Sequence, residues 1–537
     1  MAIVRMNRRQ FVSSAAALGG AALILPRGMA MLDYRSDNRR QKPLTPTSPL
    51  SASGAFDIGS RAQLFIDQQC IRTSRGVYFA LHPARKHPLN PLLRATQPWE
   101  GWRVMLSGTV LFDPDERLFK MWYLGERTPY FPNYAAFYAT SRDGVVWEKP
   151  LVGTVKCANL LRHNAVLNAS MIANVIKDNA DPDPSRRYKM IARNYRVGTG
   201  DGPLGPKALV SPDGLNWTRI NAESLFHTDD DVTAYYDDAR RLYVAMAKVF
   251  VPVRGTVRRC FSLTTSADLL KWSPPRLIFT PDLRDDAGVL ARIEEARAML
   301  DMPDDATLMR TEFYSVGTYQ AESSIVAFLS VFSINNNNRF GNSQEGPNEI
   351  QLATSRDLTN WERPFRIPVV QRGGLGEWDS GFFTTASHAF RYGDEIRLYY
   401  GCGNYTHGTP ALYHDTRGER GTRYTCSLGL ATWPLDRFVS VNGGSEGGIL
   451  TTVPVQFSGR RLELNLKANQ GEVTVALLDA SGKTIPGYGI SDPVISDSLR
   501  ATVSWQGKSE LGAMAGKPVS LRFALRNAEL YSFAFRG

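Results

Sequence analysis

A seven-residue pattern, S-x-D-x-x-x-W, recurs along this 537-residue chain and limits its fold more than any other feature. Complete copies begin at Ser141, Ser211, Ser266 and Ser355, and a degenerate fifth copy spans residues 430–436. Repeats at such intervals mark supersecondary units that cannot bury their own apolar faces alone. We therefore expect five similar units that pack against one another.

Alternating, aromatic-rich segments before each copy indicate the content of one unit. Two segments joined by a turn predict an antiparallel hairpin, although only one clear strand, residues 324–332, precedes the fourth copy. The other hairpins are expected at residues 109–113 with 119–125, 174–178 with 188–193, 233–237 with 242–248, and 388–392 with 396–401. A further strand ends at each Ser/Asp turn, and an innermost strand is expected before each hairpin. Four-stranded units repeated five times predict an all-β fold built on a five-bladed β-propeller.

The pattern changes towards the carboxy terminus. Half-buried strands at residues 462–467, 472–478, 499–505 and 519–525 predict a β-sandwich over 445–537. The propeller, expected to be the catalytic domain, then spans 57–444. One early strand, within 62–67 or 76–81, is expected to close the ring, and helical spacing within 282–303 predicts an insertion between the third and fourth blades.

The amino terminus has the form of an export signal. Arg8 and Arg9 precede an apolar run at 15–25, and small residues lead to Ala30, so residues 1–30 are expected to be a twin-arginine signal peptide. Residues 31–56, rich in Pro, Ser and Thr, are expected to be a flexible linker. This predicts a periplasmic or secreted protein that meets the twin-arginine export machinery and has no membrane association after cleavage.

Charge and cysteine usage exclude some functions. The net charge of +11 is scattered and forms no basic block, so no nucleic-acid partner is expected. Five cysteines show neither C-x-x-C nor zinc spacing, which favours buried thiols. Cys402 and Cys426 are the only pair considered for a disulfide.

Acidic residues stand near the expected starts of the innermost strands. Such strands begin beside the central channel of a propeller, so their first residues converge on one face. Four of the five starts are acidic, at Glu100, Asp231, Glu312 and Asp379. Hydrolysis of a glycosidic bond requires one carboxyl kept protonated and another kept ionised, and mutual repulsion pushes neighbouring pKa values apart. These four residues are the predicted catalytic group.

Aromatic and hydrogen-bonding residues accompany these carboxylates. The expected substrate-binding residues are Trp99, Trp102, Arg103, His163, Asn164, Tyr314, Trp378 and His407, with Arg310 as a further hydrogen-bonding group. No metal or cofactor is expected, although the carboxylates have alternative roles as strand-end caps or as ligands of a structural cation in the central channel. Asp229 and Asp230 compete with Asp231, because the register is uncertain by one or two residues. The Asp residues of the repeated turns are expected to be architectural.

The repeated hairpins with S-x-D-G-x-x-W, the run Asn90-Pro91-Leu92, and Met121-Trp122-Tyr123 resemble five-bladed propeller glycoside hydrolases. The closest resemblance is to bacterial proteins similar to family 32, with family 43 more distant. If the blade positions correspond, this resemblance implies that Glu312 is the general acid and Asp231 the transition-state or pKa-setting carboxylate. It also implies that Glu100 or Asp379 is the nucleophile or base. The chain lacks the family's W-M-N-D-P-N-G and R-D-P motifs, and Phe313 follows Glu312 where the family has Cys. Fructan specificity and the retaining mechanism are therefore not carried over.

These observations predict an exported glycoside hydrolase that acts on an oligo- or polysaccharide. The main alternative is a non-catalytic carbohydrate-binding propeller. A six-bladed sialidase-like enzyme is less favoured because its turns carry one more residue. A lyase or phosphorylase also stays open, since a basic rim of Arg103, Arg258 and Arg259 would bind an acidic sugar or phosphate.

Overall fold

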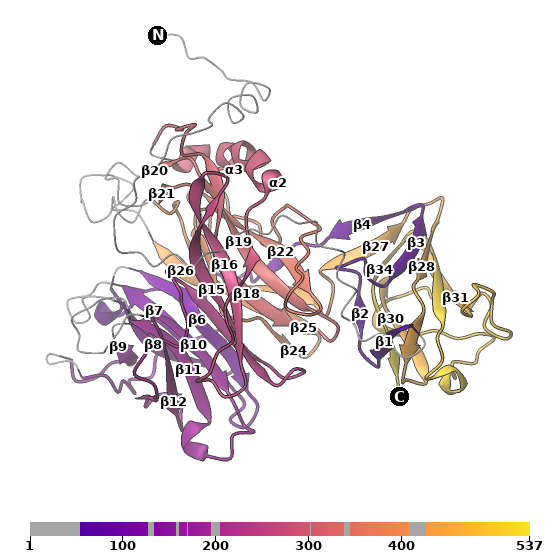
Figure 1. The fold of residues 1–537 in the computed structure, drawn as a ribbon, viewed down its shortest axis with the longest axis horizontal. Helices are drawn as coiled ribbons and strands as arrows, with labels where there is room; N and C mark the ends of the chain where they lie inside the picture. Colours follow the sequence, from indigo (N-terminus) through magenta and orange to yellow (C-terminus); the bar gives the residue numbers. More distant parts are fainter. Residues whose placement is uncertain are drawn as a thin grey trace, which may run out of the picture. The chain divides into compact units, whose positions relative to one another are not determined.

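The structure is a computed structural model, and it describes residues 54–101, 103–126, 134–156, 160–168, 170–194, 205–300, 302–337, 344–408 and 425–537. The predicted signal peptide and nearly all of the predicted linker lie outside these residues. The described part is nearly all β, as predicted (Figure 1). No helix within these ranges is long and apolar enough to cross a membrane.

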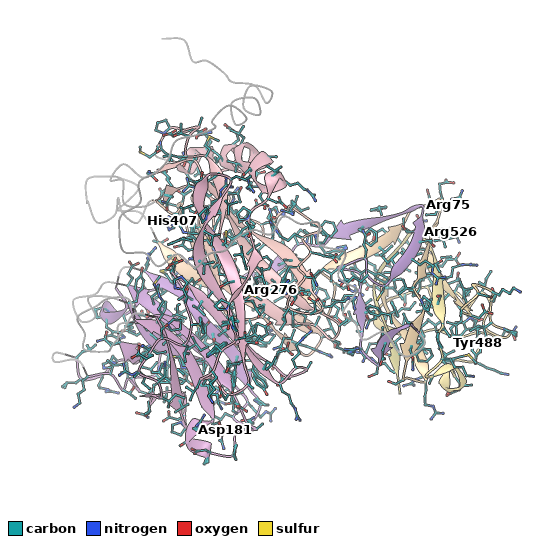
Figure 2. All side chains as sticks on the ribbon, in the orientation of Figure 1. Arg75, Asp181, Arg276, His407, Tyr488 and Arg526 are labelled. Atoms are coloured by element: carbon teal, nitrogen blue, oxygen red, sulfur yellow. The ribbon has the colours of Figure 1, made fainter. Side chains whose placement is uncertain are left out.

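Five antiparallel sheets follow one another along the middle of the chain. In order, their strands are β6 (Val104–Asp113), β7 (Leu118–Glu126), β8 (Tyr134–Ser141) and β9 (Ala165–Asn168); β10 (Ser170–Lys177), β11 (Tyr188–Asn194), β12 (Pro206–Ser211) and β13 (Thr218–Arg219); β14 (Val232–Asp237), β15 (Leu242–Val253), β16 (Thr256–Ser266) and β17 (Arg276–Phe279); β18 (Arg310–Gln320), β19 (Ile325–Ile334) and β22 (Asn348–Ser355); and β23 (Phe383–Thr385), β24 (Phe390–Tyr392), β25 (Glu395–Gly403) and β26 (Cys426–Pro434). Arg276, at the start of β17, is labelled in Figure 2. The first two sheets are joined where β6 and β10 pair in parallel at Gly108 and Ala173.

Hydrogen bonds connect neighbouring sheets in a closed cycle. Side-chain and backbone groups form the links, from Val175 N to Thr109 Oγ1, Asn174 Nδ2 to Val232 O, Thr233 Oγ1 to Val316 O, Thr318 N to Ser387 O, and Ser387 N to Gly108 O. The last link returns to β6, where the cycle began, at 2.8 Å. The first four sheets therefore contact one another through their first strands, and the fifth sheet joins the cycle through Ser387, which lies between β23 and β24.

The strand order within a sheet differs from the prediction. In the first four sheets the innermost strand is the first strand of the hairpin itself, as in the pairing of β6 with β7, whereas in the fifth sheet β23 precedes the hairpin of β24 and β25. The fourth strand instead follows the Ser/Asp turn, as β9, β13 and β17 do. The predicted inner start at 162–164 is therefore wrong, since these residues lead into β9, the outer strand of the first sheet. Alternation of apolar residues indicates strands but not their order, which explains the error.

The repeated turns are structural, as predicted. The Asp143 carboxylate accepts hydrogen bonds from the backbone N–H groups of Val145 and Val146 at 2.7 and 2.9 Å, and Asp213, Asp268 and Asp357 do the same in their turns. The residue after each Asp has a left-handed backbone, with φ of 65–78°, and is Gly in two copies and Leu in two. The fifth, degenerate copy differs, because Trp433 lies inside β26 and not after a turn.

An amino-terminal strand completes the fifth sheet, but not the one expected. The short strand β5 (Arg85–Lys86) pairs with β26. The expected ranges instead contain β2 (Gln63–Leu64) and β4 (Val77–Leu81), which pair with β34 and β27 in carboxy-terminal sheets. The predicted helical insertion contains α2 (Leu283–Ala287) and α3 (Val289–Glu295) between β17 and β18. A small hairpin of β20 (Asn336–Asn337) and β21 (Gln344–Glu345) lies between β19 and β22.

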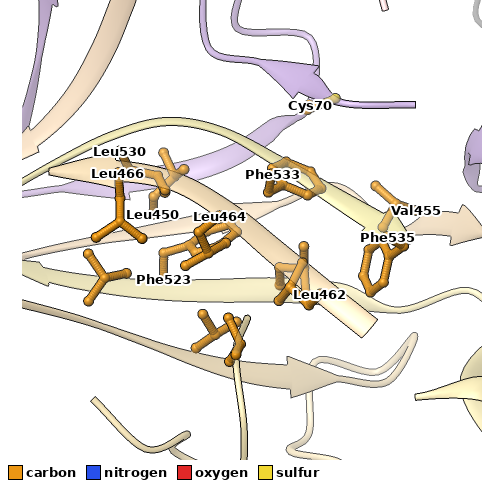
Figure 3. Packing of buried hydrophobic residues seen from close by; sticks show 14 of the residues in the cluster. Cys70, Leu450, Val455, Leu462, Leu464, Leu466, Phe523, Leu530, Phe533 and Phe535 are labelled. Atoms are coloured by element: carbon orange, nitrogen blue, oxygen red, sulfur yellow. The ribbon is translucent and has the colours of Figure 1, made fainter. Parts of the chain in front are cut away.

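The carboxy-terminal region forms two further main sheets around one apolar core. Its other strands are β1 (Phe56–Gly59), β3 (Ile71–Arg75), β27 (Val439–Gly443), β28 (Gly448–Thr452), β29 (Val455–Phe457), β30 (Arg461–Lys467), β31 (Glu472–Leu478), β32 (Asp497–Thr502), β33 (Ser520–Arg526) and β34 (Ala528–Arg536). Leu464 and Phe533 from one sheet pack in the same cluster as Leu450 and Phe523 from the other (Figure 3). Strands β1 to β4 belong with this region by pairing, so the predicted boundaries at 57 and 445 do not match the sheets.

Candidate functional site

The structure separates the four predicted carboxylates into three surroundings. Asp231 and Glu312 lie in one group of charged and aromatic residues around Tyr314. Glu100 and Asp379 have other partners, and among the described residues no hydrogen bond or ion pair joins either of them to that group.

Glu100 is completely buried and its hydrogen bonds are fully used. It accepts from the Tyr123 hydroxyl at 2.5 Å, from Lys149 Nζ at 2.6 Å, and from the backbone N–H groups of Thr96 and Gln97 at 2.8 and 2.9 Å. Burial, together with Glu100, raises the pKa of Tyr123. A carboxylate with four donors and no exposed surface caps the short helical turn at 98–100. This geometry favours a structural role for Glu100.

Three predicted substrate-binding residues, Trp99, His163 and Asn164, are buried beside the first sheet, and Asn164 is linked to Glu100 through Tyr123. Trp99 donates through its indole N–H to Asn164 Oδ1 at 2.8 Å, and Asn164 Nδ2 donates to the Tyr123 hydroxyl at 2.8 Å. His163 accepts from the backbone N–H of Ala165, and burial lowers its pKa. All three are buried, so their polar groups are directed to the protein and stabilise this corner of the first sheet.

Asp379 lies beside the strand that completes the fifth sheet. Its carboxylate contacts Lys86 Nζ at 2.6 Å and accepts from the Tyr400 hydroxyl at 2.9 Å. Trp378 stacks on the Tyr400 ring with centroids 5.4 Å apart. Trp378 and Asp379 line a hollow that Glu377, Asn90 and Arg94 also border. The ion pair of Lys86 and Asp379 connects β5 to the loop before β23.

The group around Tyr314, here called the Tyr314 cluster, contains the other predicted residues. Its members come from the starts of β14 and β18, from β15 and β16, and from the loop after β25: Asp230, Asp231, Lys248, Arg259, Glu312, Tyr314 and His407. Figure 2 labels His407. Arg193 approaches Asp230 at 3.8 Å and adds a further positive charge.

Asp230 and Asp231 are neighbours in sequence with different surroundings. Asp230 forms an ion pair with the buried Lys248 Nζ at 2.6 Å. Burial alone would raise the pKa of Asp230, but the charge and hydrogen bond of Lys248 outweigh burial and lower it. Asp231 accepts a hydrogen bond only from the backbone N–H of Val232 at 3.0 Å among the described residues. Burial raises the pKa of Asp231 to about 6, since Lys248 opposes this only partly and Asp230 adds to it.

Glu312 is held by two arginines. Arg259 Nη1 contacts one carboxylate oxygen at 2.5 Å and Arg310 Nε donates to the other at 2.7 Å. Arg259 also donates to Gln344 Oε1 at 2.7 Å, which fixes the guanidinium between two elements. Both oxygens of the Glu312 carboxylate are therefore occupied by guanidinium groups. The geometry therefore does not favour Glu312 as the general acid and favours it as the residue that orients Arg259.

Tyr314 is enclosed on its ring face and edges. Lys248 Nζ lies 3.9 Å from the ring centroid, and Phe332 and Phe382 contact the ring edge-to-face at 5.8 and 4.6 Å. His407 Nε2 lies 3.1 Å from the Tyr314 hydroxyl. The ring therefore differs from the predicted open platform for a sugar, because a lysine already occupies one face.

The remaining predicted residues divide between the cluster and the scaffold. Arg103 forms an ion pair with Glu126, and its charge contributes to the environment of His407. Arg258 is buried and contacts Asp286 at 2.7 Å, so it anchors α2 and does not form a basic rim. Trp102 lies outside the described residues.

Sequence reasoning missed Lys248, and it named Asp230 only as a competitor of Asp231. The signal for Lys248 was present, because it is the only charged residue in the otherwise apolar strand β15. A charge in a buried strand requires a buried counter-charge, and Asp230 is that partner.

No cation or disulfide is assigned to this region. Among the described residues, no group of three or more His, Cys, Asp or Glu has a geometry that would hold a metal ion. Cys402 and Cys426 are buried and unbridged, and Cys157 lies outside the described ranges.

No family model matches this chain, and no curated protein matches it. Solved structures that are similar include an N-acetylgalactosamine deacetylase from F. plautii, at 13% identity and a TM-score of 0.38 over 71% of this chain and 95% of that chain. A β-1,2-mannobiose phosphorylase from Listeria innocua is similar at 11% identity and a TM-score of 0.39, over 66% of this chain and 98% of that chain. A glycosyl hydrolase from Bacteroides ovatus is similar at 11% identity and a TM-score of 0.38, over 66% of this chain and 94% of that chain. At TM-scores this low, the likeness carries no argument about the site. The resemblance to families 32 and 43 therefore stays a prediction.

Proposed function

We propose that this protein is an exported glycoside hydrolase that cleaves a glycosidic bond in an oligo- or polysaccharide. In this proposal the five sheets are the blades of a β-propeller and the carboxy-terminal sheets form a β-sandwich. The twin-arginine pattern supports export to the periplasm or beyond. The reaction takes place at the Tyr314 cluster, and the carbohydrate is the only partner that the chemistry requires.

The observation that carries this proposal is the pair Asp230 and Asp231. Glycosidic cleavage requires a carboxylic acid that retains its proton near neutral pH and a second carboxylate that stays ionised. Burial raises the pKa of Asp231 to about 6, whereas Lys248 holds the pKa of Asp230 below its ordinary value against the effect of burial. Asp231 is therefore the proposed general acid, and Asp230 is the ionised carboxylate of the pair.

The cations of the cluster have a supporting role. Arg259 is fixed between Glu312 and Gln344, so its charge cannot move away when a substrate binds. A pre-oriented guanidinium stabilises negative charge on a leaving group or hydroxyl without reorganisation. Glu312 is the positioning residue for Arg259.

The test is hydrolysis by the mature chain of a panel of neutral and acidic oligosaccharides, followed as release of new reducing ends. Replacement Asp231→Asn keeps the size of the side chain and removes its proton. General acid catalysis contributes about 10²–10⁴-fold, so turnover is expected to fall by that factor. Repeating the assay with inorganic phosphate separates hydrolysis from phosphorolysis.

Asp436→Asn is the matched control. Asp436 is also buried, and burial raises its pKa to about 7, but it lies after β26 and outside the cluster. Activity is expected to be unchanged in this variant. Glycan binding without turnover by the unaltered chain would favour the non-catalytic alternative, and equal turnover by Asp231→Asn would exclude Asp231 as the acid.

A further inference from the structure

We propose that Tyr314 acts as a hydrogen-bond acceptor for a free hydroxyl group of the substrate, because its own proton is held by His407. Tyr314 is thus a specificity-determining residue, and the ligand class is a glycan with an unsubstituted hydroxyl beside the acid. This inference rests on the proposed function. It adds which chemical group the site recognises.

The direction of the hydrogen bonds follows from one backbone carbonyl. His407 Nδ1 lies 2.8 Å from the carbonyl oxygen of Gln344, which can only accept, so Nδ1 carries the proton. Burial, together with the charge of Arg259, lowers the pKa of His407 to about 3, so the ring is neutral. Its Nε2 then has a lone pair and no proton. The Tyr314 hydroxyl, 3.1 Å away, must therefore donate to Nε2.

The phenol keeps its proton in this arrangement. Burial, together with the charge of Asp230, raises the pKa of Tyr314, so the hydroxyl remains neutral. Donation to His407 uses the only proton and leaves the oxygen lone pairs available. Among the described residues, no other donor is within hydrogen-bonding distance of this oxygen.

The enclosure of the ring restricts contact to this oxygen. Lys248 covers one face at 3.9 Å, and Phe332 and Phe382 cover the edges. A sugar ring therefore cannot stack on Tyr314 as it would on an open aromatic platform. Tyr314 is partly buried and keeps some exposed surface.

The chemistry of the ligand follows. A hydroxyl group that donates to Tyr314 is accepted, whereas an O-methyl or O-acyl group at the same position has no proton to donate and leaves the oxygen unpaired. A carboxylate or phosphate oxygen is rejected at this point for the same reason. Lys248, which pairs with Asp230 at 2.6 Å, also lies over the Tyr314 ring, so the recognised hydroxyl is expected on a sugar unit near the proposed acid pair.

The binding test uses the full mature chain with Asp231→Asn, which stops turnover, and a glycan cleaved by the unaltered protein. Adding Tyr314→Phe is expected to weaken binding roughly five- to tenfold. Mono-O-methylation of one particular hydroxyl is expected to weaken binding similarly, and to have little further effect when Tyr314→Phe is present. Tyr243→Phe is the matched control, because that hydroxyl donates to Asp178 at 3.0 Å outside the cluster and its loss should leave affinity unchanged. Unchanged affinity on adding Tyr314→Phe, or a penalty for every methyl ether that is the same with and without Tyr314→Phe, would overturn the proposal.

A second measurement needs no substrate. Nitrogen-15 NMR of the full chain is expected to show His407 neutral and protonated at Nδ1 from pH 5 to pH 8. An Nε2-protonated ring, or a ring that gains charge near pH 6, would overturn the recognition proposal and leave the hydrolase proposal intact. If no glycan binds or is cleaved while His407 shows the expected tautomer, the proposed function fails, and the recognition proposal fails with it.

Discussion

Glu100 and Asp231 are both buried carboxylates near the start of a first strand, and they differ in the number of donors around them. Glu100 accepts from a lysine, a tyrosine and two backbone N–H groups. Asp231 accepts from one backbone N–H among the described residues. The neighbouring Lys248 forms its ion pair with Asp230 and not with Asp231. The protein thus satisfies one buried acid completely and leaves the other with little stabilisation of its charge.

This difference separates structure from chemistry. A carboxylate whose oxygens are all occupied holds elements together, but it has no lone pair or proton for a substrate. A buried carboxyl with few donors disfavours its own ionisation and keeps a proton to higher pH. Position in the repeat does not distinguish Glu100 from Asp231. The number of hydrogen-bond donors around each carboxylate does.

The largest expected effect is on stability, from Glu100→Gln. Removing the charge takes the ionic partner from the half-buried Lys149, and breaking a buried ion pair costs about 3–5 kcal/mol. The free energy of unfolding, measured in urea, is expected to fall by that amount. Turnover per folded molecule is expected to stay near that of the unaltered chain.

Glu395→Gln is the control for this effect. The Glu395 side chain is 40% exposed and lies 3.6 Å from Arg397 Nε, and a surface pair of this kind contributes at most about 1 kcal/mol. If Glu100→Gln were as stable as Glu395→Gln but inactive, the assignment of Glu100 to the scaffold would be wrong.

A smaller effect of opposite sign is expected from Asp231→Asn. The folded pKa of Asp231, about 6, is above its ordinary value of 3.8. Above pH 6 the folded protein therefore carries a buried charge that costs roughly 3 kcal/mol, and this cost disappears as the pH falls from about 6 to 4 and the folded state takes up a proton first. The Asn variant is expected to be more stable than the unaltered chain at pH 8, with the difference shrinking towards zero at pH 4.

Urea unfolding of both proteins across pH 4 to 8 measures this difference. A variant less stable than the unaltered chain at pH 8 would mean that the Asp231 charge is stabilised by groups outside the described residues.

The sequence predicted the local parts of the fold well. The hairpins at 109–125 and 233–248, the Ser/Asp turns and the strand at Glu472–Leu478 match the structure because each depends on neighbouring residues. The sheet to which β4 belongs was not predicted, since its partner β27 lies more than 350 residues later. Strand pairing over such a distance leaves no signal in local alternation.

The site was predicted in part for the same reason. The acidic start of β14 follows from repeat position, and that prediction led to Asp231. Whether a carboxylate has all its hydrogen-bond donors depends on residues that are distant in sequence. Lys149 is such a residue for Glu100, and Lys86 is one for Asp379. The direction of the Tyr314 hydrogen bond depends on the Gln344 carbonyl, which no side-chain pattern reveals.

The central claim is that one carboxyl of the Asp230 and Asp231 pair keeps its proton while the other stays ionised. Carbon-13 NMR of the two carboxyl groups, followed from pH 3 to pH 8 in the full mature chain, measures this directly. We expect Asp231 to titrate near pH 6 and Asp230 to remain ionised below the ordinary range for aspartate. Two carboxyls that titrate together near pH 4, or the reverse order, would contradict the account.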